Sequence, residues 1–364
     1  VPDMRDYHKI LLYVPPHMSH EGAVSQAARL ARRCGDAITL VDCIETAPWR
    51  RTPWRSACFG RTLSRSCTMA ASERNAKLDR LAAELRDQRI VATAKLLSGR
   101  PAFEITKKVV SDGHDLVVMT NNSSTNPEMG KSYGATMVRL LRICPCEILV
   151  TKGDEDRRFQ RCVAAVDPQP VDAHRRELNW KILTRGMVLA TPEECEFDVI
   201  AAWSPFAESV LSLKYSDETR ESYIEATRCR AQQSLDRLLG RFTTDIHRWC
   251  VRLRKGEVDQ VILDALRQRN ADLLLIATVG RRGLPGVFIG NTDETIIRKC
   301  DCTVQVVKSD LIESPGKPDS SRSMRRESSG SSADVPLETE PTRDVHSSLM
   351  ASRNSKTELN ERPN

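Results

Sequence analysis

The feature that most constrains the fold of this chain is an internal repeat. A segment that begins at a glycine, passes two cysteines and ends in an apolar run and a lysine occurs at 134–152 and again at 290–308. The matching residues lie 156 positions apart: Gly134 and Gly290, Cys144 and Cys300, Cys146 and Cys302. The duplication covers nearly everything from 9 to 308. Because 364 residues suffice for two domains that each bury a core, the sequence predicts one unit made twice.

Each copy alternates short apolar runs, typical of buried strands, with longer segments of helical periodicity. In the first copy we expect strands near 9–14, 37–43, 90–97, 115–120 and 147–151, and helices near 20–33, 71–88, 101–112 and 135–143. In the second copy we expect strands at 162–166, 197–203, 249–253, 273–277 and 303–307, and helices at 172–190, 221–239, 258–267 and 293–299. Apolar strands joined by helices indicate a parallel sheet covered on both faces. The predicted fold is therefore α/β: two tandem doubly wound, Rossmann-like domains of five parallel strands, each with its ligand crevice at the carboxyl ends of the strands.

Changes in composition place the expected boundaries. The first domain is predicted at 1–153 and the second at 154–310. Within the first, 45–70 is rich in Arg, Ser, Cys and Trp, and we expect an irregular insertion there that serves as a lid, as a partner contact or as neither. The segment 311–364 is dominated by Ser, Pro, Glu and Arg and has few large apolar residues. Such a segment cannot bury enough surface to fold, so it is predicted to be a disordered tail.

The 12 cysteines are expected to be reduced. Cys43, Cys144, Cys162 and Cys302 stand in or beside apolar runs, where a thiol packs as a small hydrophobe. No Cys-x-x-Cys motif and no Cys/His cluster with zinc spacing occurs, so no metal site is predicted. A redox or metal role for the repeated Cys-x-Cys pairs is less favoured than core packing. Reduced thiols, a polar N-terminal stretch and the lack of an apolar run of about 18 residues indicate a cytoplasmic protein with no membrane partner.

The net charge of +6 comes from a large, mixed set of acids and bases, which indicates solubility more than a nucleic-acid footprint. One basic and aromatic segment, 49–55, has the side chains to stack on bases and contact phosphates. We favour the alternative that it is a solvated loop whose Trp side chains pack on the neighbouring domain. A nucleic-acid partner is therefore not expected.

One group of residues in the second copy has the pattern of a phosphate site. Glycines let backbone amides approach an anion, and a helix N-terminus offers unpaired N–H groups and positive dipole. Asp167, at the end of the first strand of this copy, would accept a hydrogen bond from an adenine amino group or a ribose hydroxyl. The candidate nucleotide- or phosphate-binding residues are Asp167, Gly280, Arg281, Gly283, Gly290, Asn291 and Thr292.

Three short segments carry a resemblance to a known family: Val-Ala-Ala-Val-Asp at 163–167, Gly-Arg-Arg-Gly at 280–283 and Gly-Asn-Thr at 290–292. They resemble the first strand and the phosphate loop of the universal stress protein family, and 277–294 resembles its tandem, E-type members most closely. The resemblance covers about 8–308. It implies the HUP, or adenine nucleotide α-hydrolase-like, fold and a cytoplasmic stress-response role exerted through association with a partner or ligand. It also implies ATP or another nucleotide as ligand, with Asp167 on the adenine side.

The resemblance also implies how the chain associates. Two domains in one chain would form an intramolecular version of the family's dimer, with the fifth strands as the docking edge, because unpaired strand edges favour such pairing. A homodimer of the whole chain and protein partners of unknown identity are the other expected associations.

The sequence departs from the family pattern in both copies. In the second, the loop between Gly283 and Gly290 is shorter than in ATP-binding members, and Asn291 stands where those prefer Ser or Thr, although Thr292 follows. In the first copy, Pro15 replaces the acid, and 121–126 is a polar run without glycine. Only Gly130, Gly134 and Thr136 remain there, so we expect the first copy to keep the fold without the nucleotide.

Enzyme classes that share this fold lack their signatures here. The chain has no pyrophosphatase-type loop, no nucleotidyl-transferase motif and no GxGxxG after a strand, and its seven histidines are scattered. We therefore predict a binding protein and not an enzyme. Two alternatives stay open: a weak ATPase that uses the 280–292 loop, and a structural interaction protein without ligand, in which the glycines serve a tight turn and Thr292 caps a helix.

Overall fold

The structure of the chain is a computed structural model that describes residues 7–16, 18–34, 37–45, 56–121, 127–152, 158–190, 195–205, 216–242, 249–278 and 291–308. Within these ranges the side chains of 56–68, 127–133, 190 and 291 are not described. The expected tail at 311–364 lies outside the described residues, as do 46–55 of the expected insertion.

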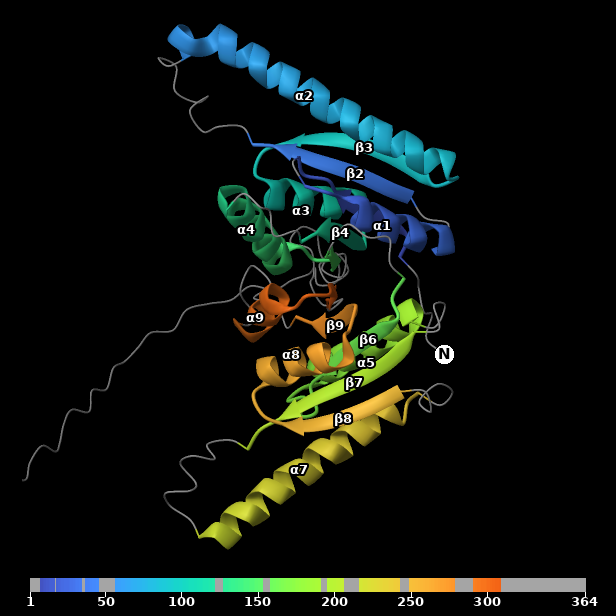
Figure 1. Ribbon diagram of the computed structural model, residues 1–364, viewed down its shortest axis with the longest axis vertical. Coiled ribbons are helices and arrows are strands. Elements are labelled where there is room, and N and C mark those ends of the chain that lie inside the picture. The colour runs from blue at the N-terminus through green and yellow to red at the C-terminus, as the bar shows by residue number, and fades with distance from the viewer. Residues whose placement is uncertain are drawn as a thin grey trace, which may run out of the picture. The chain divides into compact units, whose positions relative to one another are not determined.

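The first half alternates strands and helices (Figure 1). Its elements are β1 (Lys9–Tyr13), α1 (Glu21–Cys34), β2 (Ala37–Ile44), α2 (Ser56–Asp87), β3 (Val91–Ser98), α3 (Pro101–Asp112), β4 (Leu116–Thr120), α4 (Pro127–Ile143) and β5 (Glu147–Thr151). Local chemistry sets several of these bounds. Pro101 supplies a fixed φ in the first turn of α3, and Gly113 ends that helix in the left-handed conformation at φ 70°.

The second half repeats this order. Its elements are β6 (Arg161–Val166), α5 (Ala173–Ala190), β7 (Glu196–Trp203), α7 (Asp217–Leu239), β8 (Trp249–Lys255), α8 (Val258–Arg269), β9 (Leu273–Ala277), α9 (Asn291–Lys299) and β10 (Thr303–Val307). Ser216 begins α7 by accepting a hydrogen bond from the backbone N–H of Thr219, and Asn270 ends α8 at φ 46°. All five predicted strands of this half are confirmed, with bounds that differ by at most a few residues.

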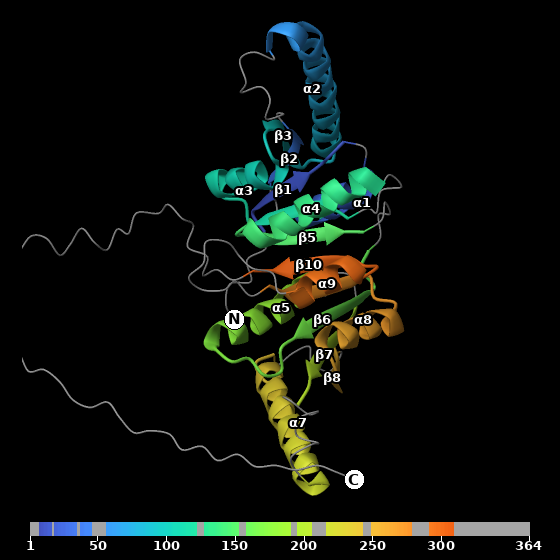
Figure 2. The same cartoon turned by 90° about the vertical axis from the view of Figure 1, so that its left-hand side faces the viewer.

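The ten strands form one sheet in the order β3-β2-β1-β4-β5-β10-β9-β6-β7-β8. Within each half the strands are parallel, as predicted. The halves meet where β10 pairs with β5 in antiparallel orientation, with Gln305 opposite Leu149 (Figure 2). The fifth strands are therefore the docking edge, as expected from the family dimer.

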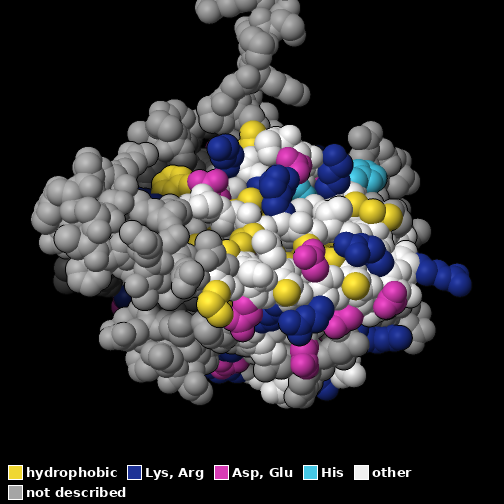
Figure 3. Space-filling view, turned by 90° about the horizontal axis from the view of Figure 1, so that it is seen from above, with side chains coloured by type: hydrophobic (Ala, Val, Ile, Leu, Met, Phe, Trp, Pro, Cys, Tyr) yellow, Lys and Arg dark blue, Asp and Glu magenta, His cyan; other side chains and the backbone are white. Residues whose placement is uncertain are grey.

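Helices cover both faces of the sheet. One core cluster lies between the sheet and α1, α2, α5 and α7, and the other between the sheet and α3, α4, α8 and α9. The cysteines expected in the core, Cys43, Cys144, Cys162 and Cys302, are buried and reduced. On the face that Figure 3 views, acidic and basic side chains are interspersed over the described residues, which fits a charge that serves solubility. None of the described helices is both long and apolar enough to cross a membrane.

Two helices, α2 and α4, start well before the residues expected from the sequence. The helix expected from 71 begins at Ser56, so 56–70 is part of α2 and not of an irregular insertion. The helix expected from 135 begins at Pro127. In both cases polar and small residues weakened the apolar periodicity that would have marked the first turns, although Ala, Arg and Met in these segments favour helix.

A polar network crosses between the two halves beside the paired strands. The Tyr7 hydroxyl donates to Glu147 Oε2 at 2.5 Å, and Gln305 Nε2 donates to the same carboxylate oxygen at 2.8 Å. Arg185 Nε donates to Glu147 Oε1 at 3.0 Å, and its guanidinium lies 4.4 Å from the centre of the Tyr7 ring. Tyr7, Glu147 and Gln305 are buried, so the network fixes how the halves pair.

Two lysines at repeat-related positions also cross the junction. Lys152, after β5, donates to the backbone oxygen of Cys300 at 3.0 Å, and Lys308, after β10, donates to the backbone oxygen of Leu141. Antiparallel pairing of the fifth strands brings each lysine to the helix–strand corner of the opposite half. Lys308 is fully buried there, and burial lowers its pKa from 10.5 to about 8.

Candidate functional site

The acid predicted from the sequence, Asp167, lies at the carboxyl end of β6. Asp167 follows the last residue of this strand, and its backbone is held by Asn179 of α5. The backbone N–H of Asp167 donates to Asn179 Oδ1 at 2.9 Å, and Asn179 Nδ2 donates to the Asp167 carbonyl at 2.6 Å. Asn179 is only 4% exposed, so this turn is fixed from inside the domain.

The Asp167 carboxylate has two partners within its own turn. Oδ1 accepts the backbone N–H of Gln169 at 2.8 Å, and Oδ2 lies 3.4 Å from Arg175 Nη1. The Asp167 side chain remains 36% exposed, and its long contact with Arg175 is the weaker of the two. A ligand hydroxyl or amino group can therefore reach the carboxylate if Arg175 turns aside.

The glycine loop falls mostly outside the described residues. The structure describes β9 up to Ala277, then Thr278, and resumes at Asn291, the first residue of α9. Gly280, Arg281, Gly283 and Gly290 therefore lie outside the described residues, as does the side chain of Asn291. Thr292 lies in the first turn of α9 with its side chain exposed.

A polar group that sequence reasoning missed lies at the carboxyl end of β9. Thr278 is 1% exposed, and its hydroxyl has no hydrogen-bond partner among the described residues. A buried hydroxyl without a partner costs about 1–3 kcal/mol, so such groups are uncommon unless a ligand or water completes them. Strand β9 is the neighbour of β6, so Thr278 lies at the same sheet edge as Asp167. The sequence feature that could have identified Thr278 is its position directly after an apolar strand.

The equivalent edge of the first half is built differently. Asn121 occupies the position of Thr278, since each donates its backbone N–H to the end of the adjoining fifth strand. Helix α4 starts at Pro127, so Gly130 and Gly134 lie inside the helix, whereas α9 starts directly after Gly290. The first half therefore presents no helix N-terminus at the repeat-related glycine.

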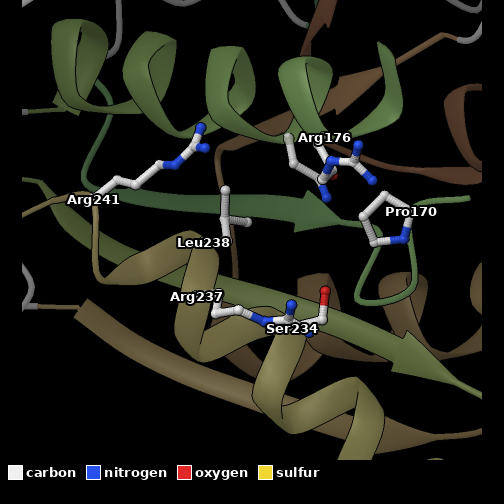
Figure 4. A pocket seen from close by; sticks show the side chains of 7 residues that line it. Pro170, Arg176, Ser234, Arg237, Leu238 and Arg241 are labelled. Carbon is white, nitrogen blue, oxygen red and sulfur yellow. The ribbon is translucent and has the colours of Figure 1, made fainter. Parts of the chain in front are cut away.

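A pocket of about 320 Å³ opens beside the Asp167 turn, between α5 and α7 (Figure 4). Its lining residues are Pro170, Arg176, Asn179, Ser234, Arg237, Leu238 and Arg241. Asn179 links the pocket to the Asp167 turn, because it lines the pocket and also donates a hydrogen bond to the backbone oxygen of Asp167. Sequence reasoning did not identify this pocket, since its walls come from two helices that are separated in the chain by β7.

The cysteine pairs lie away from this edge. Cys144 and Cys146 come just before β5, and Cys300 and Cys302 just before β10, and three of these four residues, Cys144, Cys300 and Cys302, are buried. The sulfurs of Cys144 and Cys146 are 3.4 Å apart. No group of three or more His, Cys, Asp or Glu side chains suited to a metal ion occurs in the part of the chain that the structure describes.

Comparisons with known proteins agree with the geometry. A family model described as Universal stress protein family matches residues 6–152 and 159–308. The chain is 24% identical over 318 residues to Universal stress protein E of Photorhabdus laumondii subsp. laumondii, a match that covers 86% of this chain and 99% of that protein. It is likewise 24% identical over 314 residues to Universal stress protein E of Escherichia coli (strain K12), which covers 86% and 97%.

Solved structures show the same fold. A crystal structure of a functionally unknown protein from Pseudomonas aeruginosa PAO1 matches with a TM-score of 0.60 at 22% identity, over 84% of this chain and 94% of that one. A universal stress protein from Archaeoglobus fulgidus DSM 4304 matches with a TM-score of 0.56 at 15% identity, over 84% and 97%.

Proposed function

Because the chain belongs to the universal stress protein family, we propose that it is a cytoplasmic stress-response binding protein whose second domain binds a phosphate-bearing ligand, with ATP or another nucleotide as the first candidate. The proposal includes association with protein partners and the domain bounds 1–153 and 154–310. It assigns binding, and not catalysis, as the activity.

The observation that carries the proposal is the difference between the two sheet edges. In the second half, an acid, a buried hydroxyl with no partner among the described residues and a helix N-terminus lie at one edge: Asp167, Thr278 and the start of α9. A helix N-terminus that directly follows a glycine is a favourable place for a phosphate, because unpaired N–H groups and the helix dipole both attract an anion. The first half lacks the acid, and its corresponding helix starts earlier.

Each residue then has a chemical role. The backbone N–H groups of Gly280, Arg281, Gly283, Gly290 and Asn291 would surround the phosphate, and the Thr292 hydroxyl would donate to it. At the other end of the ligand, Asp167 would accept a hydrogen bond from a ribose hydroxyl or an adenine amino group. The Thr278 hydroxyl, which is buried at the same sheet edge as Asp167 and has no hydrogen-bond partner among the described residues, would donate to the same ligand.

Identification of the bound molecule tests this function. The purified protein would be denatured and the released small molecules identified by mass spectrometry, and ATP would be added in a thermal-shift assay. We expect ATP to raise the melting temperature of the wild type, and Thr292→Val to reduce that rise. The matched control is Thr136→Val at the repeat-related position of the first half, which should leave the rise unchanged.

Two results would contradict the proposal. Release of no phosphate-bearing molecule together with no thermal shift would favour a structural interaction protein without ligand. Magnesium-dependent ATP hydrolysis that disappears in Thr292→Val would favour the weak ATPase instead.

A further inference from the structure

The pocket between α5 and α7 has a strongly one-sided charge. Three of its seven lining residues are arginines, Arg176, Arg237 and Arg241, and none is an acid. The remaining residues supply an amide, a hydroxyl and the apolar side chains of Pro170 and Leu238. A hollow lined by one sign of charge concentrates the electric field and attracts ligands of the opposite sign.

The positive charge in this pocket is not neutralised from within the described protein. Many other arginines of this half have carboxylate partners; Arg175 contacts Asp167, and Arg228 contacts Glu225 at 2.7 Å. Among the described residues, no carboxylate forms an ion pair with Arg176, Arg237 or Arg241. The nearest acid along α7, Asp236, accepts a hydrogen bond from Gln232 at 2.8 Å and does not line the pocket.

The arginines reach the pocket from two separate elements. Arg176 extends from α5, whereas Arg237 lies on α7 and Arg241 just after that helix (Figure 4). In the same view Leu238 lies between Arg241 and Arg176, and Ser234 lies next to Arg237. Arg237 Nε donates to the backbone oxygen of Gln233 at 3.2 Å, which steadies the side chain while the rest of its guanidinium stays available.

The size and charge of the pocket define the class of ligand. A volume of about 320 Å³ fits a small molecule and lies at the lower end for such sites. One guanidinium group can donate two parallel hydrogen bonds to two oxygens of a phosphate. Arginines on opposite walls of the pocket therefore favour a ligand with more than one anionic group. Two linked phosphates carry on the order of three negative charges, which matches three arginines.

We propose that the pocket between α5 and α7 is a second anion site that binds a small ligand with two or more phosphate groups through Arg176, Arg237 and Arg241. The site goes beyond the proposed function, because none of its lining residues belongs to the 280–292 loop. It adjoins the Asp167 turn through Asn179, so occupation of the pocket would also restrain that turn.

Calorimetric titration of the full chain with inorganic pyrophosphate tests the proposal. The double variant Arg237→Gln/Arg241→Gln removes two positive charges and keeps polar, although shorter, side chains. We expect it to weaken pyrophosphate binding by about fivefold or more, because charged hydrogen bonds are lost, and wild-type binding to weaken as salt is added. The matched control is Arg230→Gln, since Arg230 is exposed on the same helix, makes the same bond to a backbone oxygen four residues earlier and does not line the pocket.

The outcomes separate this site from the loop. The proposal is supported if the double variant loses pyrophosphate affinity while Arg230→Gln keeps it and all melting temperatures agree with the wild type. It is overturned if wild type shows no binding at millimolar pyrophosphate, if the double variant binds as wild type does, or if Arg230→Gln weakens binding equally. Loss in Thr292→Val alone would assign pyrophosphate to the loop and leave the arginine pocket without a ligand.

Discussion

Glu147 and Arg185 form an ion pair at 3.0 Å that joins the two halves of the chain, with Glu147 at the start of β5 and Arg185 on α5. The side chain of Glu147 is 10% exposed and that of Arg185 is 23% exposed, so the pair lies in a largely dry environment. Removal of one partner of such an ion pair costs much more stability than replacement of both partners by apolar residues.

We therefore expect Glu147→Gln to lower the free energy of unfolding by about 2 kcal/mol, because Arg185 loses the carboxylate that it contacts at 3.0 Å. In the double variant Glu147→Gln/Arg185→Met, part of that loss should return. Urea unfolding of the two single variants and the double variant measures the coupling. The control is Glu225→Gln in the exposed pair with Arg228, which should change the stability much less, because solvent screens that pair. Additive effects at Glu147 and Arg185 would contradict this account.

Gly186 marks a point of close packing between α5 and β7. A Cβ at this position would lie 2.3 Å from two carbons of the Phe197 ring, and that ring packs on Trp249 with 5.0 Å between centroids. Gly186→Ala should therefore destabilise the protein by about 1–3 kcal/mol despite the better helix propensity of Ala. Gly134→Ala in α4 is the matched control, because nothing lies within 4 Å of its added Cβ, and it should stabilise by up to about 1 kcal/mol. Thermal unfolding of both variants checks the pair; equal stability would argue against close packing at Gly186.

His114 should make the protein less stable in mild acid. Burial lowers its pKa from 6.5, against an opposing effect of Asp112, and its Nε2 lies 3.0 Å from Thr39 Oγ1. Below pH 6.5 the unfolded chain then binds more protons than the native protein at this position, so stability falls as pH falls. Lys108 and Lys9 also disfavour the imidazolium. The urea midpoint of wild type should drop more than that of His114→Gln between about pH 7.5 and about pH 5.5. Parallel curves would contradict the assignment.

If the two halves are produced as separate chains, the unpaired edges of their fifth strands, β5 and β10, should drive association. The central residues of β5, Ile148, Leu149 and Val150, are at most 1% exposed, and removal of β10 would leave this edge unpaired. We expect separate chains of 1–153 and 154–310 to self-associate and to form a one-to-one complex on mixing. Light scattering after size exclusion measures this. Two monomeric halves that ignore one another would contradict the role of the β5–β10 edge.

Much of the fold could be predicted because it depends on local patterns. The repeat, the alternation of strands and helices and the buried cysteines are all readable from apolar periodicity. The starts of α2 and α4 were not, since Ser56 and Pro127 begin turns whose apolar spacing is weak. Helix propensity favours those turns, and propensity is a weaker signal than a buried face.

The candidate site was predicted only in part, because it depends on contacts between distant segments. Asp167 and Thr292 could be selected from their positions after a strand and at a helix start. The ion pair of Asp167 with Arg175 and the burial of the Thr278 hydroxyl, which has no partner among the described residues, appear only once side chains are placed. The arginine pocket likewise depends on how α5 packs on α7, which no short sequence pattern encodes.

The proposed function requires the two repeats to be unequal, with the nucleotide bound by the second one. Photo-crosslinking with an azido-adenosine triphosphate probe, followed by peptide mapping, tests it most directly because the label marks where the adenine lies. If the second repeat binds the nucleotide, we expect labelled peptides around 163–170 or 278–295, and excess ATP should suppress the labelling. Label in the first half near Tyr13 to Pro16, or labelling that ATP does not suppress, would contradict it.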